Sequence, residues 1–144
     1  MPRRLRSRPG ALLLGPLLCA CAAPSPPAGD PRLASISLHA PPADVISAQR
    51  LDDQRLDRSN NLQITPGAHE LLVRYQYDSR QGSGLFGEPR QVTCQLRVRY
   101  AQFAAGQHYR LEARPLALKA QGWLYGADRD NPLARAEVVR CGPF

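Results

Sequence analysis

Hydrophobic and polar residues alternate one by one along most of the chain after residue 32, which is the pattern of β-strands that bury one face. The clearest case is Gln91–Tyr100, where every second residue from Val92 onward is predicted to face inward. His69–Tyr77 and His108–Arg114 follow the same pattern. Weaker runs predict further strands at Leu33–His39, Val45–Gln49, Asn61–Ile64, Leu116–Ala120, Gly122–Tyr125 and Ala134–Arg140.

Residues that favour turns separate these runs, and no stretch carries a convincing helical stripe. A single turn of helix is expected at most, over Leu51–Leu56. Residues 32–144 are therefore predicted to form one all-β domain, an antiparallel β-sandwich or open barrel of about seven to nine short strands. The turns are expected at Pro41-Pro42, Pro66-Gly67, Gly82-Ser83-Gly84, Ala105-Gly106 and Asp130-Asn131-Pro132.

The first twenty residues have the layout of an export signal. Four arginines precede the apolar run Ala11–Leu18, and no acidic residue occurs before Asp30. The run is far shorter than the roughly 18 to 20 residues of a membrane-spanning helix, and Gly15 and Pro16 interrupt it. Residues 1–20 are therefore predicted to be a signal peptide.

The end of this segment, Leu18-Cys19-Ala20-Cys21, resembles the lipobox of bacterial lipoproteins. The resemblance implies cleavage before Cys21, which then carries the lipid that anchors the protein to a membrane. Ala22 stands where an Asp would retain such a protein at the inner membrane, so the resemblance implies the outer membrane, with the domain facing the periplasm. Residues 21–31 are rich in Pro and Ala and are expected to form a flexible tether. Ordinary secretory cleavage near Ala22 or Ala23 is the alternative.

The net charge at first favours a nucleic-acid-binding protein, because 19 basic and 12 acidic residues among 144 give +7. Four of the basic residues belong to the signal, so residues 21–144 carry 15 basic against 12 acidic residues and a charge of +3. Export also separates the domain from genomic nucleic acid. Nucleic acid is therefore not an expected partner.

Two of the four cysteines, Cys19 and Cys21, fall in the processing region, which leaves Cys94 and Cys141 as a pair. Exported proteins reside in oxidising compartments, where such pairs form disulfides. A zinc site would need further ligands at short spacing, and a redox pair is normally Cys-x-x-Cys; neither pattern occurs. A structural Cys94–Cys141 disulfide is predicted.

A second resemblance lies in Asn61–Tyr75, which contains Pro66-Gly67-Ala68-His69. This stretch resembles the Pro-Gly-x-His hairpin of PEGA-like surface-layer modules and of many uncharacterised bacterial lipoproteins. The likeness implies a hairpin and no particular chemistry.

The segment Gly82–Gly87 matches the Gly-x-Gly-x-x-Gly pattern of dinucleotide sites. Glu88-Pro89 and a strand follow it, so no helix supplies the amides and dipole that a pyrophosphate needs. A flexible hairpin loop is expected instead. Leu85 and Phe86 are its only candidates for partner contact, although an apolar loop tip is more often tucked against its own sheet.

Motifs for catalysis or metal binding are absent from the sequence. His39, His69 and His108 form no recognisable ligand cluster, although folding could bring the last two together. Asp128-Arg129-Asp130-Asn131 opens like a calcium loop, but Pro132 and Leu133 replace the next ligand and the glycine. No Gly-x-Ser-x-Gly elbow occurs. Neither enzymatic activity nor a metal or cofactor is expected.

The candidate binding feature is a set of arginines predicted to face outward. Residues 97–99 and 110–114 are expected to pair as a hairpin across Phe103–Gln107, which would join their arginines into one cationic face. Guanidinium groups suit phosphate and carboxylate, so anionic lipid, lipopolysaccharide, peptidoglycan or an acidic envelope protein are candidate partners. Solvation of an exposed sheet face is the competing interpretation. The candidate residues are Arg74, Arg97, Arg99, Arg110 and Arg114.

The sequence therefore predicts a lipid-anchored outer-membrane protein that binds or scaffolds in the cell envelope. One alternative is a small-ligand or glycan binder that uses Trp123, Tyr125 and the basic face, although these two aromatic residues are more simply interpreted as core. The least favoured alternative is an envelope hydrolase, which would need His69 and His108 to converge in a pocket.

Overall fold

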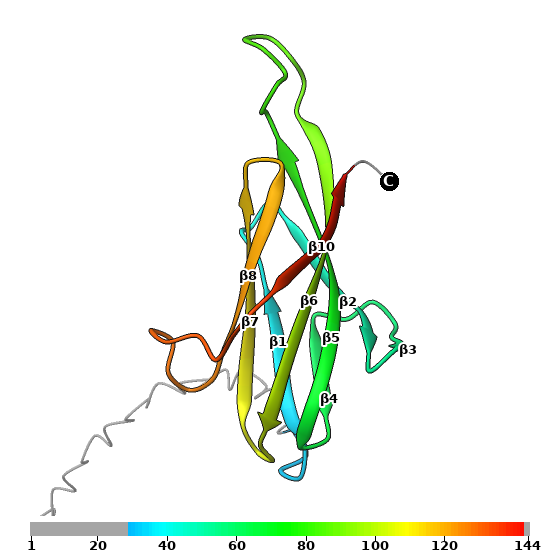
Figure 1. The fold of residues 1–144 in the computed structure, drawn as a ribbon, viewed down its shortest axis with the longest axis vertical. Coiled ribbons are helices and arrows are strands. Elements are labelled where there is room, and N and C mark those ends of the chain that lie inside the picture. Colours follow the sequence, from blue (N-terminus) through cyan, green and yellow to red (C-terminus); the bar gives the residue numbers. More distant parts are fainter. Residues whose placement is uncertain (1–28, 143–144) are drawn as a thin grey trace, which may run out of the picture.

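The computed structural model describes residues 29–142, and in this range it contains strands and no helix (Figure 1). The all-β prediction is confirmed. The signal peptide, Cys21 and most of the predicted tether lie outside the described residues. The strands are β1 (Ala34–His39), β2 (Val45–Leu51), β3 (Gln54–Arg55), β4 (Asn61–Ile64), β5 (Gly67–Ser79), β6 (Arg90–Phe103), β7 (His108–Leu116), β8 (Lys119–Tyr125), β9 (Ala134–Arg135) and β10 (Glu137–Gly142).

The strands form two five-stranded sheets that pack face to face as a β-sandwich. Sheet A has the order β4-β1-β7-β8-β9, and sheet B has the order β10-β6-β5-β2-β3. All neighbouring strands are antiparallel except β1 and β7, which run parallel. Neither sheet closes into a barrel.

The predicted alternation places the core between the sheets. In β1 the burial pattern alternates without a break, and in β5 every second residue from Leu71 to Tyr77 is buried. Burial of one such side chain contributes about 1.5–3 kcal/mol relative to leaving it in water. An aromatic cluster of Tyr100, Phe103 and Tyr109 closes the core near the β6–β7 turn, with ring centroids 4.8–6.0 Å apart.

Two local predictions are wrong. Leu51–Leu56 forms no helical turn, because Asp52 and Asp53 both have positive φ, 48° and 63°, and make the tight turn of the β2–β3 hairpin. The Asp52 carboxylate stabilises this turn by accepting a 2.8 Å hydrogen bond from the Glu70 amide. Leu116–Ala120 is no strand either, because Ala117 has a φ of 57° and turns the chain from β7 into β8.

The predicted hairpin between residues 97–99 and 110–114 is also wrong. β6 is already paired with β5 on one edge and with β10 on the other, so the chain after Phe103 crosses to sheet A. There β7 lies between β1 and β8. The five candidate arginines are therefore divided between two opposite faces of the sandwich.

Trp123 and Tyr125 do not enter the core. They alternate in β8 with the buried residues Gly122 and Leu124, and so they lie half-buried on the outer face of sheet A. Tyr125 stands opposite Arg110 in the strand register.

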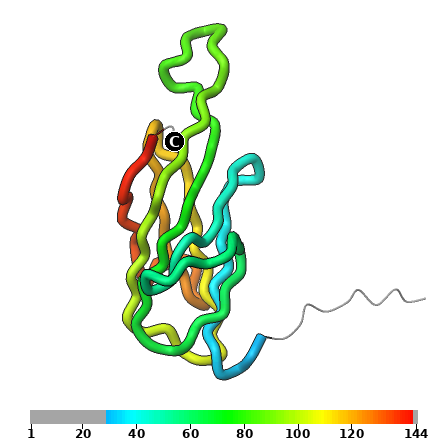
Figure 2. The backbone as a smooth tube through the Cα atoms, turned by 90° about the vertical axis from the view of Figure 1, so that its right-hand side faces the viewer, coloured from blue at the N-terminus to red at the C-terminus, as the bar shows by residue number. Residues whose placement is uncertain are grey.

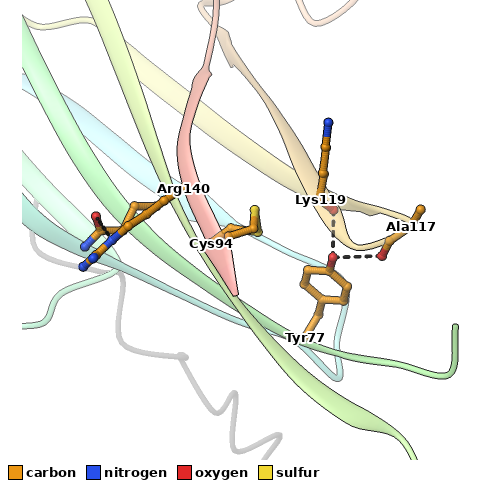
Figure 3. Close-up of a disulfide and its surroundings, with 7 residues drawn as sticks. Tyr77, Cys94, Ala117, Lys119 and Arg140 are labelled. Atoms are coloured by element: carbon orange, nitrogen blue, oxygen red, sulfur yellow. Dashed lines mark hydrogen bonds between the residues drawn. A yellow bond between two sulfur atoms is a disulfide. The ribbon is translucent and has the colours of Figure 1, made fainter. Parts of the chain in front are cut away.

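The predicted Cys94–Cys141 disulfide is confirmed. The two cysteines are direct partners in the β6–β10 ladder, and Figure 3 shows the bond inside the sandwich, with Arg140 pointing to the other face of sheet B. The chain reaches β10 from β9, where the Ala136 amide still donates to the Gly122 carbonyl of sheet A. The last strands thus contribute an edge to each sheet.

Candidate anion-binding groove

A groove of about 570 Å³ runs across the outer face of sheet B. Five of its ten lining residues are arginines, and none is acidic. Leu56, Leu72 and Val139 supply apolar surface between the cations. We call this feature the arginine groove, and it is lined by Gln49, Arg50, Arg55, Leu56, Arg58, Leu72, Gln95, Arg97, Val139 and Arg140.

Strand register explains how residues far apart in sequence meet in the groove. One row across the sheet runs from Arg97 in β6 through Leu72 in β5 to Arg50 in β2, which stands opposite Arg55 in β3. Side chains at such directly opposed positions share one face of a sheet. The row therefore aligns three arginines around a leucine.

The segment after β3 forms one wall of the groove. It follows the free edge of β2, where the Leu56 amide donates to the Gln49 carbonyl and the Ala48 amide donates to the Ser59 carbonyl, each at 2.9 Å. These backbone hydrogen bonds hold Arg58 beside β2. The opposite wall comes from β10, in which Arg140 donates from Nε to the Gln95 side-chain oxygen at 3.0 Å.

Among the described residues, two carboxylates pair with arginines at one end of this basic surface. The Glu70 carboxylate lies 3.2 Å from Arg97 Nε and 2.6 Å from Arg99 Nε, and Glu137 lies 3.9 and 3.7 Å from their Nη1 atoms. Within residues 29–142, no ion pair involves Arg50, Arg55 or Arg58. The groove therefore keeps an excess of positive charge around these three side chains.

Arg74 lies next to the groove, in a row that runs from Arg140 through Gln95 to Arg74 and Ser47. Its Nε is buried and has no hydrogen-bond partner among the described residues. A buried donor without an acceptor is costly, by about 1–3 kcal/mol. Arg74 therefore extends the basic surface beside the groove, although its Nε itself is not exposed.

The other two candidate arginines lie on the opposite side of the molecule. On the outer face of sheet A, Arg110 Nε lies 2.6 Å from one oxygen of Glu112, and Arg114 lies 3.1 Å from the other. Although burial alone would raise the pKa of Glu112, the positive charges of Arg110 and Arg114 hold it below its usual range. The carboxylate stays ionised, so these arginines are already engaged.

The sequence analysis missed four lining arginines, Arg50, Arg55, Arg58 and Arg140. In the sequence the first three stand beside Asp52, Asp53 and Asp57, a pattern that is typical of a solvated turn. The turn itself is confirmed, but its arginines face the groove. The missing information was the order of strands, since β2 and β10 reach this surface only by pairing with β5 and β6.

The histidines do not converge into a site. His69 lies between the Asp52 carboxylate, 2.5 Å from Nδ1, and the Thr65 carbonyl, 2.7 Å from Nε2. His108 pairs with the Ser35 hydroxyl in sheet A. Both ring nitrogens of His69 are engaged by the turns around it, and the described part of the chain holds no group of three or more metal-ligating side chains.

Asp128 also has a local role. It accepts hydrogen bonds from the Asn131 side chain and the Asp130 amide, both at 2.8 Å, and these contacts lower its pKa. Asp128–Asn131 therefore form a turn whose side chains hydrogen-bond within the turn itself. These hydrogen bonds account for the conformation of the turn without a calcium ion.

Comparison with known proteins adds no relative: no family model, no curated protein and no solved structure matches the chain. Within residues 29–142 no helix is long and apolar enough to cross a membrane. The arginine groove is therefore interpreted from its own geometry and charge.

Proposed function

We propose that this protein is an outer-membrane lipoprotein, anchored through Cys21 and facing the periplasm, which binds an anionic partner in the arginine groove. The observation that carries the binding function is the groove itself, with five arginines and no acid among its lining residues. The export signal and the lipobox-like Leu18–Cys21 support the location.

The groove suits a ligand with several anionic groups. Its volume of about 570 Å³ falls in the usual range of small-molecule sites. Guanidinium groups bind phosphate and carboxylate through paired N–H donors, and the apolar side chains between them can cover carbon atoms of the ligand. Phosphate or carboxylate groups of envelope lipids, peptidoglycan or an acidic protein share this chemistry.

Binding fits the groove better than catalysis does. Its lining consists of Arg, Gln, Leu and Val, so it offers neither a nucleophile nor a general base that titrates near neutral pH. A glycan site around Trp123 and Tyr125 is less well supported, because these residues lie on the other side of the sandwich from the groove. We therefore propose a binding or scaffolding protein without enzymatic activity.

The binding function can be tested with two soluble polyanions, short-chain inorganic polyphosphate and polyglutamate, which separate phosphate from carboxylate recognition. Arg50→Ser with Arg55→Ser is expected to weaken binding of the preferred probe at least tenfold at constant salt. The matched control is Arg110→Ser with Arg114→Ser, which removes the same charge from the face where Glu112 already pairs the arginines. Equal losses in the two variants would overturn the proposal, because net charge alone would then explain binding.

The anchor can be tested separately by labelling cells that make the protein with radioactive palmitate. The wild type and Cys19→Ser are expected to incorporate label, and Cys21→Ser is expected to lose it. An unlabelled mature protein that begins at Ala22 or Ala23 would contradict lipidation. It would leave the groove proposal untouched.

A further inference from the structure

The β5–β6 hairpin extends beyond the rest of the sandwich (Figures 1 and 2). The sandwich still supports the hairpin at Tyr77, whose hydroxyl lies 2.9 and 2.8 Å from the carbonyl oxygens of Ala117 and Lys119 in the β7–β8 turn (Figure 3). Past Ser79 and Arg90, the last paired residues, a ten-residue loop forms the tip. The tip therefore stands clear of the sheets.

Leu85 and Phe86 occupy this tip and are 93% and 96% exposed. Of the two interpretations of this apolar tip, the one in which it is tucked against its own sheet is thus wrong. No other large hydrophobic side chain in the described part of the chain is exposed by more than 57%. Two adjacent apolar side chains that are exposed to water contribute no free energy of burial. They would gain it when another surface covers them.

The loop has a defined shape. The Ser83 amide and hydroxyl both donate to the Arg80 carbonyl, at 3.2 and 2.6 Å, and the Gln81 amide donates to the Ser79 hydroxyl. A Cβ at Gly87 would lie 1.6 Å from the Ser83 carbonyl oxygen, so the closing contact of the loop requires glycine there. A preformed loop loses little conformational entropy on binding.

The tip lies at the end of the sandwich opposite to the start of the described chain. Leu33 contacts the β6–β7 turn, where its carbonyl accepts a hydrogen bond from the Gly106 amide at 2.9 Å. The fourteen residues of β6 separate that turn from the loop by about 43 Å at the usual rise per residue. The chain between Cys21 and Gly29 spans about 29 Å at most when fully extended. This linker is therefore too short for the domain to turn over and bring the tip end-on to the anchoring membrane.

The charges beside the tip are balanced. Asp78 and Glu88 flank the loop together with Arg80 and Arg90, and all four are exposed. This surface lacks the excess of basic residues with which a protein approaches anionic lipid headgroups. A dry apolar pocket with a polar rim, as found at protein–protein interfaces, complements it better.

We propose that Leu85 and Phe86 form a docking knob that inserts into an apolar pocket of a partner protein of the cell envelope. The direction in which the knob points rests on the anchoring proposed above, whereas its exposure, shape and charge do not. The arginine groove and the knob are separate surfaces, so the protein can hold an anionic ligand and a protein partner at the same time.

The test uses the full chain in the cells that make it, with the photoreactive residue p-benzoylphenylalanine in place of Phe86. The matched control carries the same residue in place of Asn131, an exposed residue in a polar turn. A protein crosslinked only from position 86 is identified by mass spectrometry and purified. Its affinity for the purified full-length lipoprotein is then measured for the wild type, Phe86→Ser and Gln81→Ser, where Gln81 is an exposed polar residue of the same loop.

The proposal expects Phe86→Ser to weaken this affinity at least tenfold and Gln81→Ser to leave it within twofold. Crosslinking to lipid would overturn it in favour of membrane insertion, and crosslinking to a second copy of the chain would overturn it in favour of self-association. Absence of a product, or equal affinity of the wild type and Phe86→Ser, would also overturn it. Palmitate labelling and polyanion binding of Phe86→Ser report on the anchor and the groove independently, so a failure of the knob leaves them standing.

Discussion

The two outer faces of the sandwich carry arginines on neighbouring strands, but the faces differ in how these arginines pair with carboxylates in the described part of the chain. On sheet A, Glu112 lies between Arg110 and Arg114 and contacts both. On sheet B, Glu70 and Glu137 pair with Arg97 and Arg99, whereas the neutral Gln95 stands between Arg140 and Arg74 in the strand register. We therefore propose that the carboxylates paired with the arginines of a face, rather than the number of arginines, decide whether that face can bind anions.

The two sheets also differ in how their edges are held. Sheet B is stapled at its β10 edge by the Cys94–Cys141 disulfide, whereas sheet A ends in the two-residue strand β9. The staple fixes the strand that supplies Val139 and Arg140 to the groove. The groove is thus built on the sheet whose edge strand is held by a disulfide.

Removal of the disulfide is expected to have the largest effect. In the chain-entropy model a closed loop of this length stabilises a domain by about 4 kcal/mol, so Cys94→Ala with Cys141→Ala should lower the free energy of unfolding by that order, measured by urea denaturation. Hydrogen exchange should rise more in β10 than in β4, an edge of sheet A. A loss below about 1 kcal/mol would show that the loop-closure account of sheet B is wrong.

Gln95→Glu would place a carboxylate between two arginines of sheet B, as Glu112 lies between two arginines of sheet A. The new carboxylate would lie in the row between Arg74 and Arg140 and compete with a bound anion. Polyanion affinity is expected to fall roughly tenfold, the scale of one added charge at close range. Thermal stability should be unchanged or higher, because Arg74 Nε has no acceptor among the described residues of the wild type. Unchanged affinity, measured by calorimetry at constant salt, would contradict the comparison of the two faces.

Glu112→Gln is the reciprocal change and should have a smaller effect. It releases Arg110 and Arg114, so a protein that already carries Arg50→Ser and Arg55→Ser should regain part of its polyanion binding, about threefold in affinity. Stability should fall by about 1 kcal/mol, because the arginines are partly exposed and the lost hydrogen bonds are replaced in part by water. If polyanion affinity does not increase, Glu112 is not what keeps the outer face of sheet A from binding anions.

The pH dependence of stability gives the finest test of Glu112. Its pKa is below the usual 4.5 in the folded state, so its stabilising contribution is complete above that value and is lost as the pH falls through the folded-state pKa. The difference in unfolding free energy between the wild type and Glu112→Gln should therefore shrink as the pH falls from 5 towards 2.5. Asp52 and Asp128 also have lowered pKa values, but they are common to both proteins and cancel. A difference that does not vary with pH would contradict an ionised Glu112.

The strands could be predicted from sequence because the alternation of apolar and polar residues lies within each strand. The alternation in Gln91–Tyr100 reports which face is buried whatever strand lies beside it. The pairing of Cys94 with Cys141 was predictable for a similar reason, since only two cysteines follow the lipobox-like segment. The strand ends differ from prediction by a few residues, as in β5, which starts at Gly67.

The candidate site was only partly predictable because it depends on which strands are neighbours. Arg74, Arg97 and Arg99 were correctly placed on an outer face. Adjacency in sequence was taken for adjacency in the sheet, however, which wrongly placed Arg110 and Arg114 on the same face as these three. Phe86 illustrates a different limit. An apolar tip can fold back only if the rest of the sandwich lies within its reach. That depends on how far β5 and β6 extend beyond the other strands, which is set by the pairing of the two strands with each other.

The parallel contact between β1 and β7 sets the order in which this chain can complete its fold. Ser35 aligns with His108, so the first strand obtains one of its two neighbours only after 73 further residues have been made. Domains rich in such distant contacts fold in milliseconds to seconds, because a large loop must close before the contact gains anything. Sheet A can therefore be completed only once β7 is present, although β1 can pair with β4 much earlier.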